Sequence, residues 1–194
     1  EVELDAKTFL NDPRLTISPI EAEEQVKAIT GGSHHLTRNL VSMDNPDHRH
    51  YRAMTQNYFA AKNMKALEDE IRALARQSVD HMASLGGQCD FVEEVAIWYP
   101  LRVIMMTLGA DPSDEKFLMK ITQEVFGPED PDVGRPEDLG GLFATIAEFN
   151  EWCNKITAER RENPRDDVAS VIANAMLADG SPMPELEAMS YYLI

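Results

Sequence analysis

The chain has 194 residues and a formal net charge of −16, because 34 Asp and Glu residues outnumber 18 Lys and Arg residues. Its length fits one domain or part of a larger one, and its 43% of hydrophobic residues suffice for a sizeable core. The acidity argues against a nucleic-acid-binding protein, since that class needs a basic face. No apolar run reaches the roughly 18–20 residues that span a bilayer, and two cysteines are too few for a disulfide framework. These features predict a soluble, cytoplasmic, globular protein.

Helix signals dominate the first half of the chain. A capping box at 18–21 predicts a helix that stops at Gly31-Gly32. A second helix is expected from about Asp44 to Tyr58, with acidic groups at its positive end. Apolar residues then recur at steps of three and four from Met64 to Leu85, which predicts one helix that ends at Gly86-Gly87.

The second half is also helical. Residues 91–108 are apolar almost all round, which predicts a buried helix that Pro100 kinks or splits. No repeat and no convincing β-hairpin is found, so the predicted fold class is mainly α. Further helices are expected at 111–126, at 139–161, at 167–177 and after the turn at 180–184.

The richest cluster of chemically active side chains lies at 44–52. His48 and Arg52 are four residues apart, so they project from one face of the expected helix. An imidazole and a guanidinium fork together suit a carboxylate or a phosphate. The alternative is a solvated helix start with mixed charge, which spacing alone does not exclude.

Metal-binding and nucleophile patterns are poor by comparison. His48 and His50 are two residues apart and therefore lie on different sides of a helix, and no zinc-binding spacing is present. Cys89 and Cys153 have no histidine arrangement beside them and are expected to be small core residues. No catalytic serine motif, P-loop or dinucleotide fingerprint occurs.

The string Leu40–Met54, which reads LVSMDNPDHRHYRAM, resembles the C-helix signature of the cytochrome P-450 haem-thiolate monooxygenases. Bacterial members have the pattern Ser-Met/Leu-Asp-Pro-Pro-Glu/Asp-His-x-x-x-Arg, and this chain departs from it in having Asn45 in place of the first proline. Residues 87–92, 99–105 and 165–172 are similar, in the same order, to later parts of the family's chain.

Three further stretches are similar to one bacterial branch of that family, the branch that oxidises terpineol. They are Ile29–Gly32, Thr122–Gly127 and Met189–Tyr192. Together the similar stretches cover nearly all of the 194 residues. The chain looks like the N-terminal half of such a protein.

The resemblance implies the mostly helical P-450 prism fold, from about its B helix to the start of its I helix, as the front part of one catalytic domain. It implies a haem-dependent monooxygenase that hydroxylates a small hydrophobic substrate, such as a monoterpenoid, with O₂ and electrons from an iron–sulfur ferredoxin and its reductase. The cysteine that binds the haem iron is expected beyond Ile194, so the 194 residues alone are expected to be inactive.

The resemblance also implies roles for single residues. His48 and Arg52 match the pair that hydrogen-bonds a haem propionate, and Arg49 matches a basic residue on the face where a ferredoxin docks. No catalytic residue and no metal ligand is expected within the chain. Five apolar residues match positions that line the substrate site: Leu36, Leu40, Val41, Val125 and Phe126.

A second class of function stays open at this point, a self-contained helical binding or interaction module without catalysis. That hypothesis predicts that the chain alone folds cooperatively and stays monodisperse. A piece of a larger enzyme would instead expose an apolar patch and aggregate.

Overall fold

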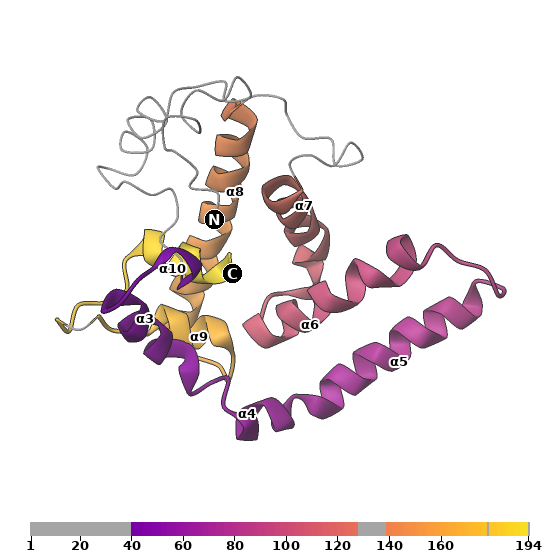
Figure 1. The fold of residues 1–194 in the computed structure, drawn as a ribbon, viewed down its shortest axis with the longest axis horizontal. Coiled ribbons are helices and arrows are strands. Elements are labelled where there is room, and N and C mark those ends of the chain that lie inside the picture. The colour runs from indigo at the N-terminus through magenta and orange to yellow at the C-terminus, as the bar shows by residue number, and fades with distance from the viewer. Residues whose placement is uncertain (1–39, 128–138, 178, 194) are drawn as a thin grey trace, which may run out of the picture. The chain divides into compact units, whose positions relative to one another are not determined.

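The computed structural model describes residues 40–127, 139–177 and 179–193. These residues belong to one compact unit, Asn39–Ile194. Within them all regular elements are helices, apart from one isolated β-bridge, so the expected mainly α fold is confirmed (Figure 1). None of the described helices is both long and apolar enough to span a bilayer. The helix expected at 18–30 lies outside the described residues.

The described elements follow one another in a simple order. They are the 3₁₀ turn η1 (Leu40–Ser42), α3 (Asp47–Gln56), α4 (Ala61–Ala66), α5 (Glu68–Ser84), the π-helix η2 (Val92–Ala96), α6 (Trp98–Leu108), the 3₁₀ turn η3 (Pro112–Asp114), α7 (Glu115–Phe126), α8 (Leu139–Glu162), α9 (Val168–Ala173) and α10 (Glu185–Tyr192). The predictions of helices ending near residues 126 and 161 are confirmed by α7 and α8.

The single helix predicted from Met64 to Leu85 is in fact two helices. Leu67 separates α4 from α5, and its N–H bonds to the carbonyl of Met64 at 3.2 Å instead of continuing the α-helical pattern. The apolar spacing runs on across this break, which is why it predicted one helix. The predicted end is confirmed, since Gly86 and Gly87 both have positive φ.

The break in the next segment lies earlier than predicted. The π-helix η2 ends at Ala96, and α6 starts at Trp98, so Pro100 falls in the first turn of α6, where a missing N–H costs nothing. The prediction of all-round burial is also wrong, because Phe91 is 57% and Ile104 is 61% exposed.

A short hairpin, which the sequence did not predict, follows α9. The helix ends at Ala173 instead of near Leu177, because the backbone beyond it pairs with residues 181–183. The N–H of Leu177 donates to the carbonyl of Ser181 at 2.8 Å, and the N–H of Met183 donates to the carbonyl of Ala175 at 3.0 Å. These residues therefore cannot continue the helix.

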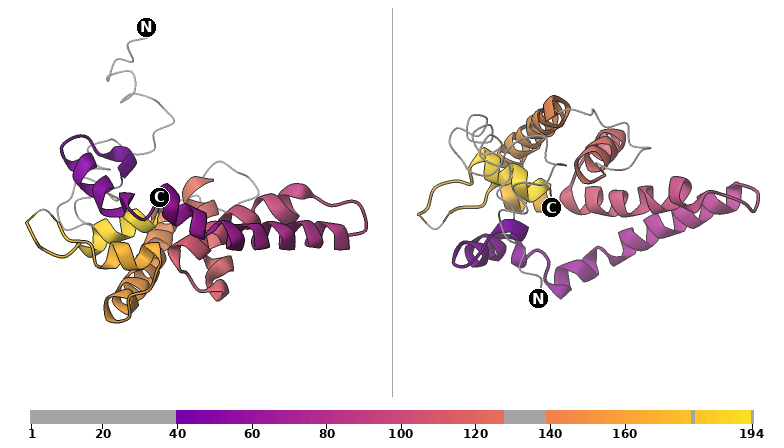
Figure 2. Two further views of the ribbon diagram at one scale, coloured as in Figure 1. Left: turned by 90° about the horizontal axis from the view of Figure 1, so that it is seen from below. Right: turned by 45° about the horizontal axis from the view of Figure 1, so that its top comes forward.

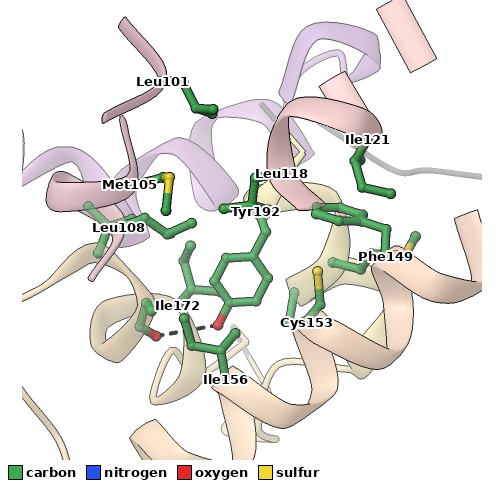
Figure 3. Close-up of a cluster of buried hydrophobic side chains, with 14 of the residues drawn as sticks. Leu101, Met105, Leu108, Leu118, Ile121, Phe149, Cys153, Ile156, Ile172 and Tyr192 are labelled. Carbon is green, nitrogen blue, oxygen red and sulfur yellow. Dashed lines mark hydrogen bonds between the residues drawn. The ribbon is translucent and has the colours of Figure 1, made fainter. Parts of the chain in front are cut away.

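The core lies where α6, α7, α8, α9 and α10 meet, and Figure 3 shows it around Tyr192. The ring of Tyr192 lies among side chains of α8 and α9, and its hydroxyl lies 2.9 Å from that of Thr157. Cys153 is also buried here, at 1% exposure, as predicted. Cys89 is exposed, so its prediction as a core residue is wrong: it follows the glycine turn in the loop between α5 and η2.

The helices around this core pack in two groups. α5 and α6 run side by side, and α9 and α10 both pack on α8 (Figures 1 and 2). α3 packs on α9 and so lies next to α10 in the fold although more than a hundred residues separate them in sequence. The part of the chain that carries His48 and Arg52 is thus supported by the last described helices.

A buried arginine ties three of these helices together. Arg160 of α8 is 1% exposed, and its Nε donates to the carboxylate of Asp167 at 2.7 Å. Its Nη2 donates to the carbonyl of Gly109, the C-cap of α6, at 2.6 Å. Asp167 in turn accepts from the N–H of Ser170 at 2.7 Å and caps the start of α9.

Gly109 supplies a sharp test of this junction. Its φ is +81°, and a Cβ added there would lie 2.2 Å from Oδ2 of Asp167. We expect Gly109→Ala to lower the free energy of unfolding by about 3 kcal/mol, since it adds steric overlap to left-handed strain. The matched control is Gly180→Ala, which has φ +82° and nothing within 4 Å, and which should cost about 1 kcal/mol. Equal losses in urea unfolding would contradict the proposed crowding at Asp167.

Candidate cofactor-binding site

Helix α3 is amphipathic, and one side of it is fixed in the protein. Tyr51 and Thr55 are buried, and Met54 and Tyr58 pack partly against the core. The helix begins at Asp47 instead of near Asp44, although the carbonyl of Asp44 already accepts from the N–H of His48 at 2.9 Å. Its buried side determines which residues remain available on the rest of its surface.

His48 and Arg52 lie on the flank next to this buried side. Four residues correspond to a rotation of about 40° around a helix axis, so the two side chains project in nearly the same direction. His48 is half-buried and Arg52 is exposed. Among the described residues neither side chain has a hydrogen-bond or ion-pair partner. The predicted pairing of an imidazole and a guanidinium on one helical face is thus present.

This pair has the chemistry that a carboxylate requires. Both groups donate hydrogen bonds, and a guanidinium matches the planar geometry of a carboxylate. No described Asp or Glu satisfies His48 or Arg52 within the chain itself, although both signs of charge are abundant. The donor set therefore fits a haem propionate, the group predicted for it.

Tyr51 anchors α3 on the side opposite its exposed surface. Its ring stacks on that of Tyr191 of α10, with centroids 6.2 Å apart and 16° between the planes. Its hydroxyl donates to the carboxylate of Glu187, and the hydroxyl of Tyr191 donates back to the carbonyl of Tyr51. Burial raises the pKa of the Tyr191 hydroxyl, with smaller contributions from Tyr51 and Glu187, so it remains a donor at neutral pH.

Tyr51 and Tyr191 are not among the site residues that the sequence predicts. A signal was present, because Tyr51, Thr55 and Tyr58 recur at steps of four and three and mark a buried helical face. The sequence did not indicate which residue packs against that face, because Tyr191 lies 140 residues further along the chain.

Arg49 lies away from the anchored side. It is exposed, as are His50 and Ala53 nearby. About 60° of rotation separates Arg49 from Arg52 around the helix axis. α3 can therefore present one basic residue to solvent and another to a bound carboxylate.

Of the five residues predicted to contact substrate, the structure describes the side chains of Leu40, Val41 and Val125, and it does not bring these three together in one cavity. Leu40 lines an apolar cavity of about 410 Å³, together with side chains that include Thr55, Phe59 and Ile104. Val41 is 81% exposed. Val125 packs against the core and does not line this cavity. The side chain of Phe126 is not described, and Leu36 lies outside the described residues.

Neither cysteine is suited to bind iron next to this pair. Cys153 lies in the core, and burial raises the pKa of its thiol far above its ordinary value, which disfavours the thiolate. Cys89 is exposed in the loop before η2. No group of three or more His, Cys, Asp or Glu residues suited to a metal ion occurs in the part that the structure describes.

Known proteins resemble this chain in sequence and in fold. No protein-family model matches the chain. It is 37% identical to cytochrome P-450-terp of a Pseudomonas species over 179 residues, which are 88% of this chain and 42% of that protein. It is 28% identical to linalool 8-monooxygenase of Pseudomonas putida over 162 residues, or 83% of this chain and 39% of that protein.

A solved structure extends the comparison to the fold. The crystal structure of CYP108D1 from Novosphingobium aromaticivorans superposes with a TM-score of 0.74 at 41% sequence identity, and the match covers 95% of this chain and 43% of that one. The chain belongs to the cytochrome P-450 family. It spans about two fifths of the length of the relatives that it matches.

If His48 and Arg52 serve a ligand and not the fold, removing them should leave stability almost unchanged. We expect His48→Ala and Arg52→Ala each to alter the free energy of unfolding by less than about 0.5 kcal/mol, as is usual for side chains that lie outside the core and have no described partner. Tyr51→Ala, on the same helix, should cost about 3–5 kcal/mol, because it removes a buried aromatic ring. Urea unfolding of the three variants measures this, and a loss above about 1 kcal/mol in Arg52→Ala would indicate a structural role.

Proposed function

We propose that this chain forms part of a haem-dependent monooxygenase that hydroxylates a small hydrophobic substrate, such as a monoterpenoid, with O₂ and electrons from a ferredoxin. One observation carries the proposal. In a member of the cytochrome P-450 family, His48 and Arg52 lie one turn apart on an anchored helix and have no partner among the described residues. A pair of donors without acceptors fits a ligand that brings its own carboxylate.

His48 and Arg52 would bind and orient the cofactor through a haem propionate. Arg52 supplies a permanent positive charge, and His48 supplies a ring N–H donor. Together they offset the negative charge of the propionate and fix its position relative to α3. The half-buried setting of His48 strengthens its hydrogen bond relative to one in bulk water.

The chemistry that haem supplies in this family is activation of O₂ at an iron whose thiolate ligand favours O–O cleavage. The residues of this chain contribute binding and orientation. Cys153 is in the core and Cys89 is in an exposed loop, so we expect the iron ligand outside these 194 residues and the chain alone to be inactive.

A small hydrophobic substrate is supported by two kinds of observation. The names of two relatives, cytochrome P-450-terp and linalool 8-monooxygenase, refer to terpene chemistry. The residues proposed as substrate contacts, Leu36, Leu40, Val41, Val125 and Phe126, are all apolar. Of these, Leu40 lines the apolar cavity of about 410 Å³, and an apolar lining selects against strongly polar ligands.

Arg49 is the proposed contact for the electron donor. It is exposed on α3, within a chain whose net charge is −16, so it contributes positive potential where little is available. An acidic ferredoxin would be attracted to such a site, and the attraction would weaken with added salt.

No feature of the described residues favours the alternative, a self-contained binding module. Phe59 and Ile104, which line the 410 Å³ cavity, are 51% and 61% exposed. Exposed apolar side chains at the edge of one cavity are compatible with packing against further protein.

The proposal is tested by haem retention in the full-length protein. We expect Arg52→Ala and His48→Ala each to speed haem transfer to apomyoglobin by about tenfold, because a charge-assisted hydrogen bond contributes about 1.5–3 kcal/mol. Arg49→Ala is the matched control on the same helix: it should keep the haem transfer rate and slow electron transfer from the ferredoxin.

Two results would contradict the assignment of these residues. One is an unchanged haem transfer rate in both Arg52→Ala and His48→Ala. The other is an equal increase in Arg49→Ala, since that would indicate a general effect of charge on α3 and not a contact with the propionate.

A further inference from the structure

Two adjacent tyrosines of helix α10, Tyr191 and Tyr192, contact two different parts of the molecule. The hydroxyl of Tyr192 points into the core, where it lies 2.9 Å from that of Thr157 and 3.5 Å from the carbonyl of Ala169 (Figure 3). The hydroxyl of Tyr191 points to α3, where it donates to the carbonyl of Tyr51 and lies 3.8 Å from Sδ of Met54. About 100° of helical rotation separates the two rings.

The contact on α3 lies at the level of the two proposed propionate donors. Tyr51 is three residues after His48 and directly before Arg52. A carbonyl oxygen has two lone pairs, so that of Tyr51 can accept from Tyr191 as well as take part in its own helix. The Tyr191 bond therefore fixes the backbone between the two donors.

Two further contacts from α10 hold Tyr51 of α3. The ring of Tyr51 stacks on that of Tyr191, and the hydroxyl of Tyr51 donates to the carboxylate of Glu187, one turn earlier on α10. Together, these two contacts and the hydrogen bond from Tyr191 to the carbonyl of Tyr51 fix the rotation of α3 about its own axis. If α3 rotated, the side chains of His48 and Arg52 would both move away from a propionate bound between them.

We propose that Tyr191 is a positioning residue for haem binding: it holds α3 at the Tyr51 carbonyl so that His48 and Arg52 face the same propionate. This inference rests on the proposed function. It extends that function by assigning the orientation of the pair to a residue that touches neither donor. Binding groups have to be held within about 0.5 Å of their working geometry by the residues behind them.

The test uses the full-length protein with its haem and compares Tyr191→Phe with Tyr192→Phe. Both changes remove one hydroxyl from adjacent residues of one helix, but only the first removes a bond to α3. We expect Tyr191→Phe to speed haem transfer to apomyoglobin by about fivefold, in line with the loss of one hydrogen bond. It should also shift the propionate-bending band in the resonance Raman spectrum.

Tyr192→Phe should lower the midpoint of urea unfolding at least as much, because its hydroxyl is buried, and leave the haem transfer rate and the Raman band unchanged. Tyr51→Phe, which keeps the ring stack and the carbonyl, is a second variant that should act in the same direction as Tyr191→Phe through the lost bond to Glu187.

Three results would overturn the inference. Haem transfer within twofold of wild type and an unshifted band in Tyr191→Phe would show that the tether does not orient the pair. Equal effects of Tyr191→Phe and Tyr192→Phe would show a general loss of stability. Absence of haem from the wild-type protein would overturn the proposed function, and this inference with it. The absorption spectrum of the wild-type protein distinguishes this result from the first two.

Discussion

The fold depends on one buried guanidinium. Arg160 is 1% exposed and holds the carboxylate of Asp167 and the carbonyl of Gly109, so it joins the end of α6 to the start of α9 from within α8. Its Nη1 lies 3.0 Å from the carboxylate of Glu159, without forming a well-aligned hydrogen bond. A buried charge of this kind is expensive unless it is paired, and removing one partner typically costs about 3–5 kcal/mol. α9 then supports α3 and α10, and the proposed haem contacts therefore depend on a junction on a different helix.

Helix α3 has three proposed roles, each on a different part of its surface. Tyr51 faces α10, His48 and Arg52 face a proposed carboxylate, and Arg49 faces solvent. The chain as a whole is acidic, with 34 acidic and 18 basic residues. Residues 48–52 of α3 contain two arginines and two histidines, so this segment is suited to bind anions. Because Arg49 lies at a different angle around the helix axis from His48 and Arg52, one short helix can bind a cofactor group and present a positive charge to a protein partner at the same time.

Most of the fold could be predicted from local signals, and the misses have physical causes. Caps and periodicity predicted most of the described helices, including the stop at Gly86. The break at Leu67 was hidden because the apolar spacing continues through it, and the early end of α9 depends on pairing with residues 181–183, which periodicity does not report. For the site, the i, i+4 spacing gave His48 and Arg52 directly. The Tyr51–Tyr191 contact depends on tertiary packing across 140 residues, and Arg160 looked like any other basic residue near a helix end.

We propose that this chain supplies one side of a haem site in a cytochrome P-450. The most direct measurement is the absorption spectrum of the full-length protein, purified, reduced and exposed to carbon monoxide. We predict the red-shifted Soret band of thiolate-ligated haem in the wild-type protein, with less of it retained per protein in the His48→Ala, Arg52→Ala double variant. A full-length protein without any haem band, or one whose haem content is the same with and without His48 and Arg52, would contradict this role of the chain.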